Sequence, residues 1–169
     1  MNIKEKFLAT AIGSFPHTDA AIAVDISMKT LPEAPVWPQL PKLGLAEQME
    51  IQYSEGMPCV VVDSEKGRMY FNTSGDYSED LALFYERYMD AMEGSGDLSP
   101  FAISPSYSRG MYELENRLIS EHKKYPYVKV HTTGPCSFSL TVVDEQKRAM
   151  YYNEEFRDVI VKALAMKCR

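Results

Sequence analysis

The sequence predicts an α/β fold: a partial (half) β/α barrel of the TIM type, with mostly parallel strands and an inserted β-hairpin. Short apolar runs alternate with amphipathic helical segments about four times along the chain, which favours a parallel sheet with right-handed crossovers. A complete barrel of eight such units typically needs roughly 250 residues. The chain has 169 residues, so we expect it to hold about half of a barrel.

The composition is that of one ordinary globular domain. Of the 169 residues, 45% are hydrophobic and 25% are charged, which suffices for a core. Lys and Arg number 18 against 24 Asp and Glu, and the net charge of −6 disfavours nucleic acid and anionic membranes as partners. No apolar run has the length of a membrane span or of a signal peptide, and Cys59, Cys136 and Cys168 lack Cys-x-x-Cys spacing. We therefore expect a cytoplasmic protein with reduced thiols.

The first predicted unit is a strand, a turn and a helix. Residues 7–13 form a short apolar run typical of a buried strand, and Gly13-Ser14-Phe15-Pro16 follows as a turn. Thr18 or Asp19 can cap the next helix, which we expect to end near Leu31. A brief second strand is predicted at Val36–Trp37, where the flanking prolines limit ladder hydrogen bonds.

A hairpin interrupts the repeat in the middle of the chain. Residues 59–63 and 68–72 are rich in β-branched and aromatic residues, and the polar connection 64–67 ends in glycine, so the two runs should pair antiparallel. The other expected elements are a helix over 45–55, an aromatic-faced helix after Ser78, a loop over 94–100, a strand over 101–104, a helix over 111–125, a strand over 127–132 and a helix from Asn153 or Glu154. Residues 136–143 fit either a helix start or a loop packed on the sheet.

The domain prediction follows from these elements. We expect one domain over residues 1–169, the N-terminal half of a barrel truncated within its last helix, because that helix reaches Lys167 without Gly or Pro punctuation. Lys167 and Arg169 also suit a natural helix C-terminus.

The turn at residues 12–17 is the first candidate binding site. Gly13 permits unusual backbone conformations, and Ser14 offers both a backbone N–H and a hydroxyl to a ligand. A helix that begins just after such a turn directs free N–H groups at an anion such as a carboxylate or phosphate. The same segment can equally be a simple connection.

Five short segments, taken in order, resemble a known family. They resemble the N-terminal half of short cobalamin-independent methionine synthase-like proteins, in the uroporphyrinogen decarboxylase and methionine synthase superfamily, over essentially the whole chain. The segments are Ile12-Gly13-Ser14-Phe15-Pro16-His17-Thr18, Trp37-Pro38-Gln39-Leu40-Pro41, Gln52-Tyr53-Ser54-Glu55-Gly56, Phe101-Ala102-Ile103-Ser104-Pro105 and Thr133-Gly134-Pro135.

This resemblance implies a β/α barrel that transfers a methyl group to a thiol such as homocysteine. In such proteins a zinc ion lowers the pKa of the thiol and so activates it. Ile12, Gly13 and Ser14 match the segment that holds the amino-acid part of homocysteine, and Glu47 or Glu50 would contact its ammonium group. The family's zinc ligands lie in the second half of the barrel and have no counterpart here, so we expect no metal or other cofactor in this chain, zinc in the other half of the parent protein, and no activity of this chain alone.

Other residues at or near the expected strand ends are candidates to line the same pocket. These are His17, Trp37, Gln39, Ser104 and His131. No catalytic residue is assigned. His131 and Cys136 are the nearest approach to a reactive pair, but apolar neighbours raise a thiol pKa and no third orienting group is apparent.

Three functions compete at this point. The leading expectation is a methyltransferase fragment whose parent binds a small thiol and a methyl donor. The second is a fragment of a uroporphyrinogen decarboxylase-like enzyme, which needs arginines near the first strand to hold carboxylates, although none occurs before Arg68. The third is a non-catalytic half-barrel that forms a homodimer through its exposed barrel edges.

Overall fold

Helices dominate the computed structural model, which describes residues 8–121 and 125–169. Within these ranges the strands β1 (Val60–Asp63) and β2 (Arg68–Phe71) make the only sheet, a two-stranded antiparallel one. The helices are α1 (Ala20–Thr30), α2 (Met49–Ser54), α3 (Ser78–Glu93), α4 (Arg109–Ser120), α5 (Pro135–Thr141) and α6 (Glu154–Lys167). Four 3-10 turns, η1 (Pro41–Leu43), η2 (Leu45–Glu47), η3 (Ser99–Phe101) and η4 (Met150–Tyr152), complete the order.

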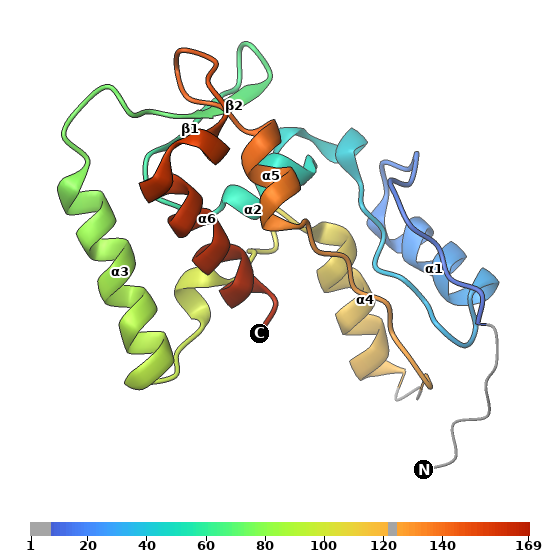
Figure 1. Cartoon of the computed structure of the whole chain (residues 1–169). Coiled ribbons are helices and arrows are strands. Elements are labelled where there is room, and N and C mark those ends of the chain that lie inside the picture. Colours follow the sequence, from blue (N-terminus) through green and yellow to red (C-terminus); the bar gives the residue numbers. More distant parts are fainter. Residues whose placement is uncertain (1–7, 122–124) are drawn as a thin grey trace.

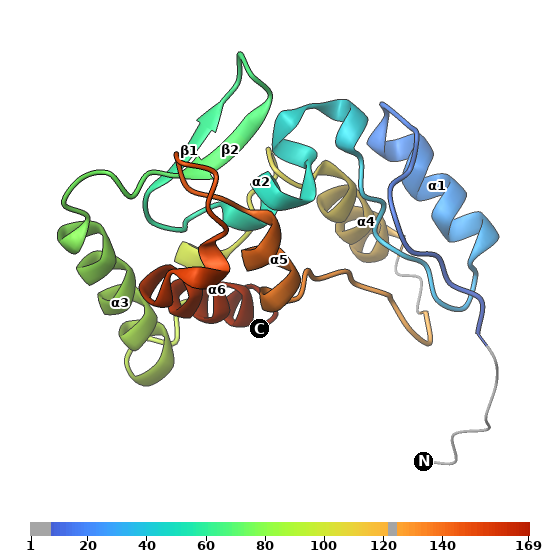
Figure 2. The ribbon, with the colours of Figure 1, turned by 45° about the horizontal axis from the view of Figure 1, so that its top comes forward.

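Four of the helices form two packed pairs, which are the two helix groups of this fold. α1 packs on α4, and α5 packs on α6, while α2 lies between the two groups (Figure 1). The view in Figure 2 shows the same division, with the hairpin projecting away from the helices. The core contains aromatic and aliphatic side chains from both groups, such as Val24 of α1, Leu114 of α4 and Phe156 of α6. No helix in residues 8–121 and 125–169 has the length and apolar character needed to cross a membrane.

The expected half-barrel is wrong. In residues 8–121 and 125–169, parallel pairing occurs only as one-residue bridges, at Ser14–Gln39, Val36–Lys129 and Phe71–Asp144, and none of these bridges extends into a parallel ladder. The described residues therefore contain no parallel sheet and no barrel-like arrangement of strands.

The segment around Val36 shows why pairing stops after one residue. The N–H of Lys129 donates to the Pro35 carbonyl (2.8 Å) and the N–H of Trp37 to the Lys129 carbonyl (3.4 Å). The backbone groups of Val36 itself bind the Ser27 hydroxyl on α1. The Val36 N–H donates to this hydroxyl (2.9 Å), and the hydroxyl donates to the Val36 carbonyl (2.7 Å). A serine of α1 thus occupies the place of a neighbouring strand, and the prolines on either side supply no further N–H donors.

The predicted strand over 7–13 is also absent from its described part, residues 8–13; Phe7 lies outside the described residues. Gly13 has φ +106°, which turns the chain out of an extended course, and Ile12 is 82% exposed. The segment is tied down by side chains, because the Lys129 Nζ donates to the Ala11 carbonyl at 2.9 Å.

The predicted strand over 101–104 is replaced by η3 and an unpaired extended segment. The N–H of Ser104 donates to the Glu55 carboxylate at 2.7 Å, so a side chain satisfies the group that a neighbouring strand would have bound. Residues 127–132 are likewise extended, with a single bridge at Lys129.

The helix and hairpin predictions are mostly confirmed. Asp19 caps α1 by accepting the N–H of Ile22, and Val60 pairs with Phe71 in the hairpin. Asn153 caps α6, and residues 135–141 form α5. The helix expected over 45–55 is divided into η2 and α2, and the helix expected after Ser78 is α3, which begins at Ser78 itself. α4 replaces the helix expected over 111–125, of which residues 122–124 lie outside the described residues.

Candidate functional site

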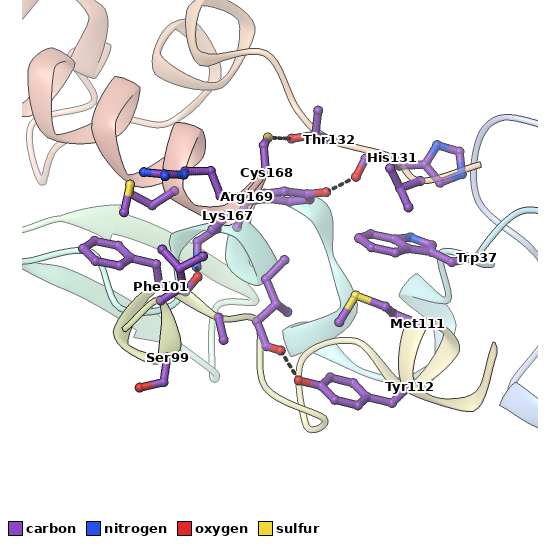
Figure 3. Close-up of a pocket in the computed structure, with 16 residues that line it drawn as sticks. Trp37, Ser99, Phe101, Met111, Tyr112, His131, Thr132, Lys167, Cys168 and Arg169 are labelled. Carbon is purple, nitrogen blue, oxygen red and sulfur yellow. Dashed lines mark hydrogen bonds between the residues drawn. The ribbon is translucent and has the colours of Figure 1, made fainter. Parts of the chain in front are cut away.

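A cavity of about 530 Å³ lies between the two helix groups (Figure 3). This volume is within the range of small-molecule sites in proteins. Most of its lining is apolar, with Phe101, Ile103 and Met111 among the contributors. Trp37 and His131 lie on one side of it, and the C-terminal end of α6 with the two residues after it lies on the other; the polar side chains of Ser99 and Tyr112 also line it.

The side with Trp37 and His131 contains two ring nitrogens without partners. The Trp37 Nε1 and the His131 Nε2 are buried, and neither has a hydrogen-bond partner among the described residues. The ring centroids lie 6.2 Å apart. Burial lowers the pKa of His131 and Lys129 acts in the same direction, while a hydrogen bond with the Trp37 backbone opposes both. The imidazole is therefore neutral at pH 7, and an indole N–H that only donates lies beside it.

Tyr53 also lines the cavity. Its hydroxyl donates to the His131 carbonyl at 2.5 Å. Burial raises the pKa of Tyr53 to about 12, although a hydrogen bond with Thr132 opposes this shift. The phenol therefore keeps its proton at neutral pH and fixes the segment that contains His131.

The opposite side is formed by Lys167, Cys168 and Arg169 (Figure 3). The Lys167 Nζ donates to the Glu55 carbonyl (2.7 Å) and to the Phe101 carbonyl (2.9 Å), so it joins α6 to the ends of α2 and η3. Burial lowers the pKa of Lys167 to about 8, against the attraction of the Glu55 carboxylate. The Cys168 Sγ lies 3.2 Å from the Thr132 Oγ1.

A separate group of buried amides lies next to Ser14. The Gln39 Nε2 donates to the Gln52 Oε1 (3.0 Å), and the Gln52 Nε2 donates to the Tyr107 carbonyl (2.6 Å). The Gln39 backbone carbonyl accepts the N–H of Phe15 at 2.8 Å, next to the Ser14–Gln39 bridge. The Gln39 Oε1 is buried and finds no donor in the described part of the chain.

Glu47 and Glu50 lie in different surroundings. Glu47 is buried, and its carboxylate accepts the N–H of Arg109 at 2.8 Å. Burial raises the pKa of Glu47, while the bond to Arg109 and its charge oppose the rise. Glu50 instead lines a smaller hollow of about 170 Å³ beside Arg68.

The structure therefore brings together only part of the predicted site. Trp37 and His131 line the cavity, and Ser14 lies beside Gln39. Ile12 and Gly13 are exposed, and the Ser104 hydroxyl is 2.9 Å from that of Ser106. His17 is partly buried, with its ring 6.1 Å from that of Phe15 and an Nδ1 that has no partner in residues 8–121 and 125–169.

Sequence reasoning missed the contributions of Tyr53 and Lys167. Tyr53 fits the apolar spacing of a helix and so indicates only core packing, and a lysine in the last turn of a helix is expected on electrostatic grounds alone. The burial of Lys167 depends on the distant residues Glu55 and Phe101, which no local pattern connects to it.

The described residues do not fit a zinc site. No group of three or more His, Cys, Asp or Glu side chains among them is placed to hold a metal ion. Cys59, Cys136 and Cys168 are free thiols.

The sequence and the structure were also compared with known proteins. No protein-family model, no curated protein and no solved structure matches this chain.

Proposed function

We propose that the chain binds a small thiol amino acid such as homocysteine in the cavity between Trp37 and Lys167, as the acceptor-binding part of a methionine synthase-like methyltransferase. The methyl donor, the zinc ion and the transfer step belong to a larger parent protein in this proposal. A cytoplasmic location goes with it, and the free thiols agree with a reducing compartment. The resemblance of the five segments motivates the substrate class.

The observation that carries the proposal is a largely apolar cavity of about 530 Å³ whose lining includes Trp37 and His131, two residues with buried and unpartnered ring nitrogens. A buried donor without an acceptor destabilises a protein by roughly 1–3 kcal/mol, so a ligand acceptor that reaches the Trp37 Nε1 recovers part of that amount. A carboxylate suits this donor, and Lys167 and Arg169 across the cavity add positive charge. The side chains of Ile103 and Met111 suit the methylene and sulfur atoms of the ligand.

Calorimetric titration with L-homocysteine tests this function. We expect saturable binding to the wild-type chain and about tenfold weaker binding to Trp37→Phe, which keeps an aromatic ring and removes the N–H donor. Trp37 is the only tryptophan in the sequence, so its fluorescence in the wild type reports occupancy of the cavity independently.

Two further variants make the titration specific. Glu50→Gln, in the separate hollow, should bind as the wild type does. Ser14→Ala tests whether the bridge residue contacts the amino acid; equal binding by this variant removes Ser14 from the site. Absence of saturable binding to the wild type, or equal binding by Trp37→Phe, contradicts the proposal.

The decarboxylase alternative has less support. Arg169 is the one arginine that lines the cavity formed by the described residues, whereas a polycarboxylate substrate needs several.

A second candidate function is self-association through the extended segment 127–132. The N–H groups of Tyr127 and Lys129 bind the segment 33–35, whereas those of Val128 and Val130 have no backbone acceptor among the described residues. Val130 is 66% exposed. An unpaired edge with apolar side chains favours pairing with the same edge of a second copy, because a two-fold axis makes such an edge self-complementary.

Sedimentation velocity over the micromolar range tests this second function. We expect the average mass of the wild type to rise with concentration toward twice that of the chain, and Val130→Lys to stay monomeric because a charge on the edge opposes pairing. Val161→Lys, on the exposed face of α6, is the matched control and should associate as the wild type does. A wild type that stays monomeric throughout excludes this function.

A further inference from the structure

The ε-amino group of Lys167 lies in the wall of the largely apolar cavity, which Arg169 also lines. It donates to two backbone carbonyls, those of Glu55 and Phe101, and these contacts fix its position. The Glu55 carboxylate, whose charge attracts the Lys167 ammonium, already accepts the N–H of Ser104 at 2.7 Å. Lys167 has no ion pair with it that the structure records, and it is held by neutral acceptors.

The two carbonyl contacts determine where the lone pair of a neutral amine lies. An unprotonated primary amine has two N–H bonds, and here each has an acceptor, at 2.7 Å and 2.9 Å. The tetrahedral nitrogen then carries its lone pair in the remaining position, away from both carbonyls. Burial also lowers the pKa of Lys167 to about 8, so close to half of the molecules hold the neutral amine at pH 8.

We propose that Lys167 is a carbonyl-reactive amine, which forms an imine with a small apolar aldehyde or ketone held in the cavity against Phe101, Ile103 and Met111. The nitrogen lone pair attacks the carbonyl carbon, and the C–N bond forms as the carbonyl π electrons move to oxygen. The nitrogen loses both of its protons over the two steps, the oxygen leaves as water, and a C=N bond replaces the C=O bond. No oxidant, reductant or metal takes part.

This inference depends on the cavity and not on the thiol ligand proposed above. The competing interpretation is that Lys167 only joins α6 to the ends of α2 and η3, as a structural hydrogen-bond donor. A structural lysine would contribute to the unfolding free energy but would not react selectively with a carbonyl compound.

Reductive trapping distinguishes the two interpretations. The wild-type chain is incubated with butanal and sodium cyanoborohydride at pH 8, and the butylated lysines are located by peptide mapping and mass spectrometry. We expect butylation at Lys167 to exceed that at the exposed Lys66 at least tenfold, because the cavity holds the aldehyde beside the fixed amine of Lys167 and Lys66 has no such cavity. Equal or lower modification of Lys167 overturns the proposal.

Two variants test whether the selective butylation depends on the cavity and on the amine of Lys167. Ile103→Phe narrows the cavity and keeps Lys167, so the selective butylation should fall to the level of Lys66. Lys167→Arg keeps a cationic donor that forms no imine, and the mapped modification should disappear from position 167 while the other lysines react as before. Selective butylation that persists in Ile103→Phe, with the fold intact by circular dichroism, shows that the cavity is not involved and overturns the proposal. Because homocysteine plays no part in this experiment, its outcome is independent of the calorimetric test of the proposed function.

Discussion

At the scale of single residues, Lys167 makes the stability of this protein depend on pH. Its pKa is about 8 in the folded chain against 10.5 in the unfolded one, because burial disfavours the ammonium form. Between these two values the unfolded chain binds more protons than the folded chain does. The contribution of Lys167 to the unfolding free energy must therefore rise as the pH increases from about 8 to 10.5.

Urea unfolding at pH 7 and pH 10 measures this contribution in wild type and Lys167→Met. We expect the unfolding free energy of the wild type, relative to that of Lys167→Met, to rise by up to about 3 kcal/mol between pH 7 and pH 10. Burial raises the pKa of Tyr53 and Tyr85 to about 12 and that of Cys59 to about 11, and these shifts lower the unfolding free energy as the pH rises. Both proteins contain these three residues, so their effect cancels in the comparison. Lys66→Met, at an exposed position, should show the pH dependence of the wild type; a Lys167→Met variant that does so as well contradicts the burial of this amine.

At the scale of secondary-structure elements, Ser27 explains how α1 packs against the extended segment around Val36, although that segment belongs to no sheet. Its hydroxyl is buried and binds both the N–H and the carbonyl of Val36, which is itself fully buried. One side chain thus performs the hydrogen bonding that a neighbouring strand would otherwise provide.

Ser27→Ala should destabilise the protein by about 2–4 kcal/mol, because it leaves two buried backbone groups without partners. Chemical denaturation with circular dichroism measures the difference. Thr30→Ala is the matched control, since the Thr30 hydroxyl lies on the exposed side of the same helix and binds only the Ile26 carbonyl; we expect a change within about 0.5 kcal/mol. Similar losses for both variants would mean that the Val36 groups find other partners.

The same elements show how far the sequence determines the fold. Local signals identified α1, the hairpin and α6, because Asp19, the connection 64–67 and Asn153 act on residues a few positions away. The strands predicted outside the hairpin were wrong, because an apolar, β-branched run is also compatible with an unpaired extended segment.

At the scale of the whole molecule, the residues named from the sequence lie on only one of the two sides of the cavity. Trp37 and His131 were candidates to line a pocket because they lie near expected strand ends, and both line the cavity. The opposite side depends on how α6 meets the ends of α2 and η3, through contacts between residues far apart in the sequence. Such contacts leave no periodic pattern, so sequence reasoning could not supply Lys167 or the cavity itself.

The bridge between Val36 and Lys129 has a consequence for the order in which the chain acquires its structure. More than half of the chain separates these two residues, so during synthesis on a ribosome Trp37 emerges long before the segment that covers it. The hairpin and α1 can form early from neighbouring residues, whereas the walls of the cavity meet only after α6 has been made. Until then the tryptophan side chain is available to chaperones and to other nascent chains.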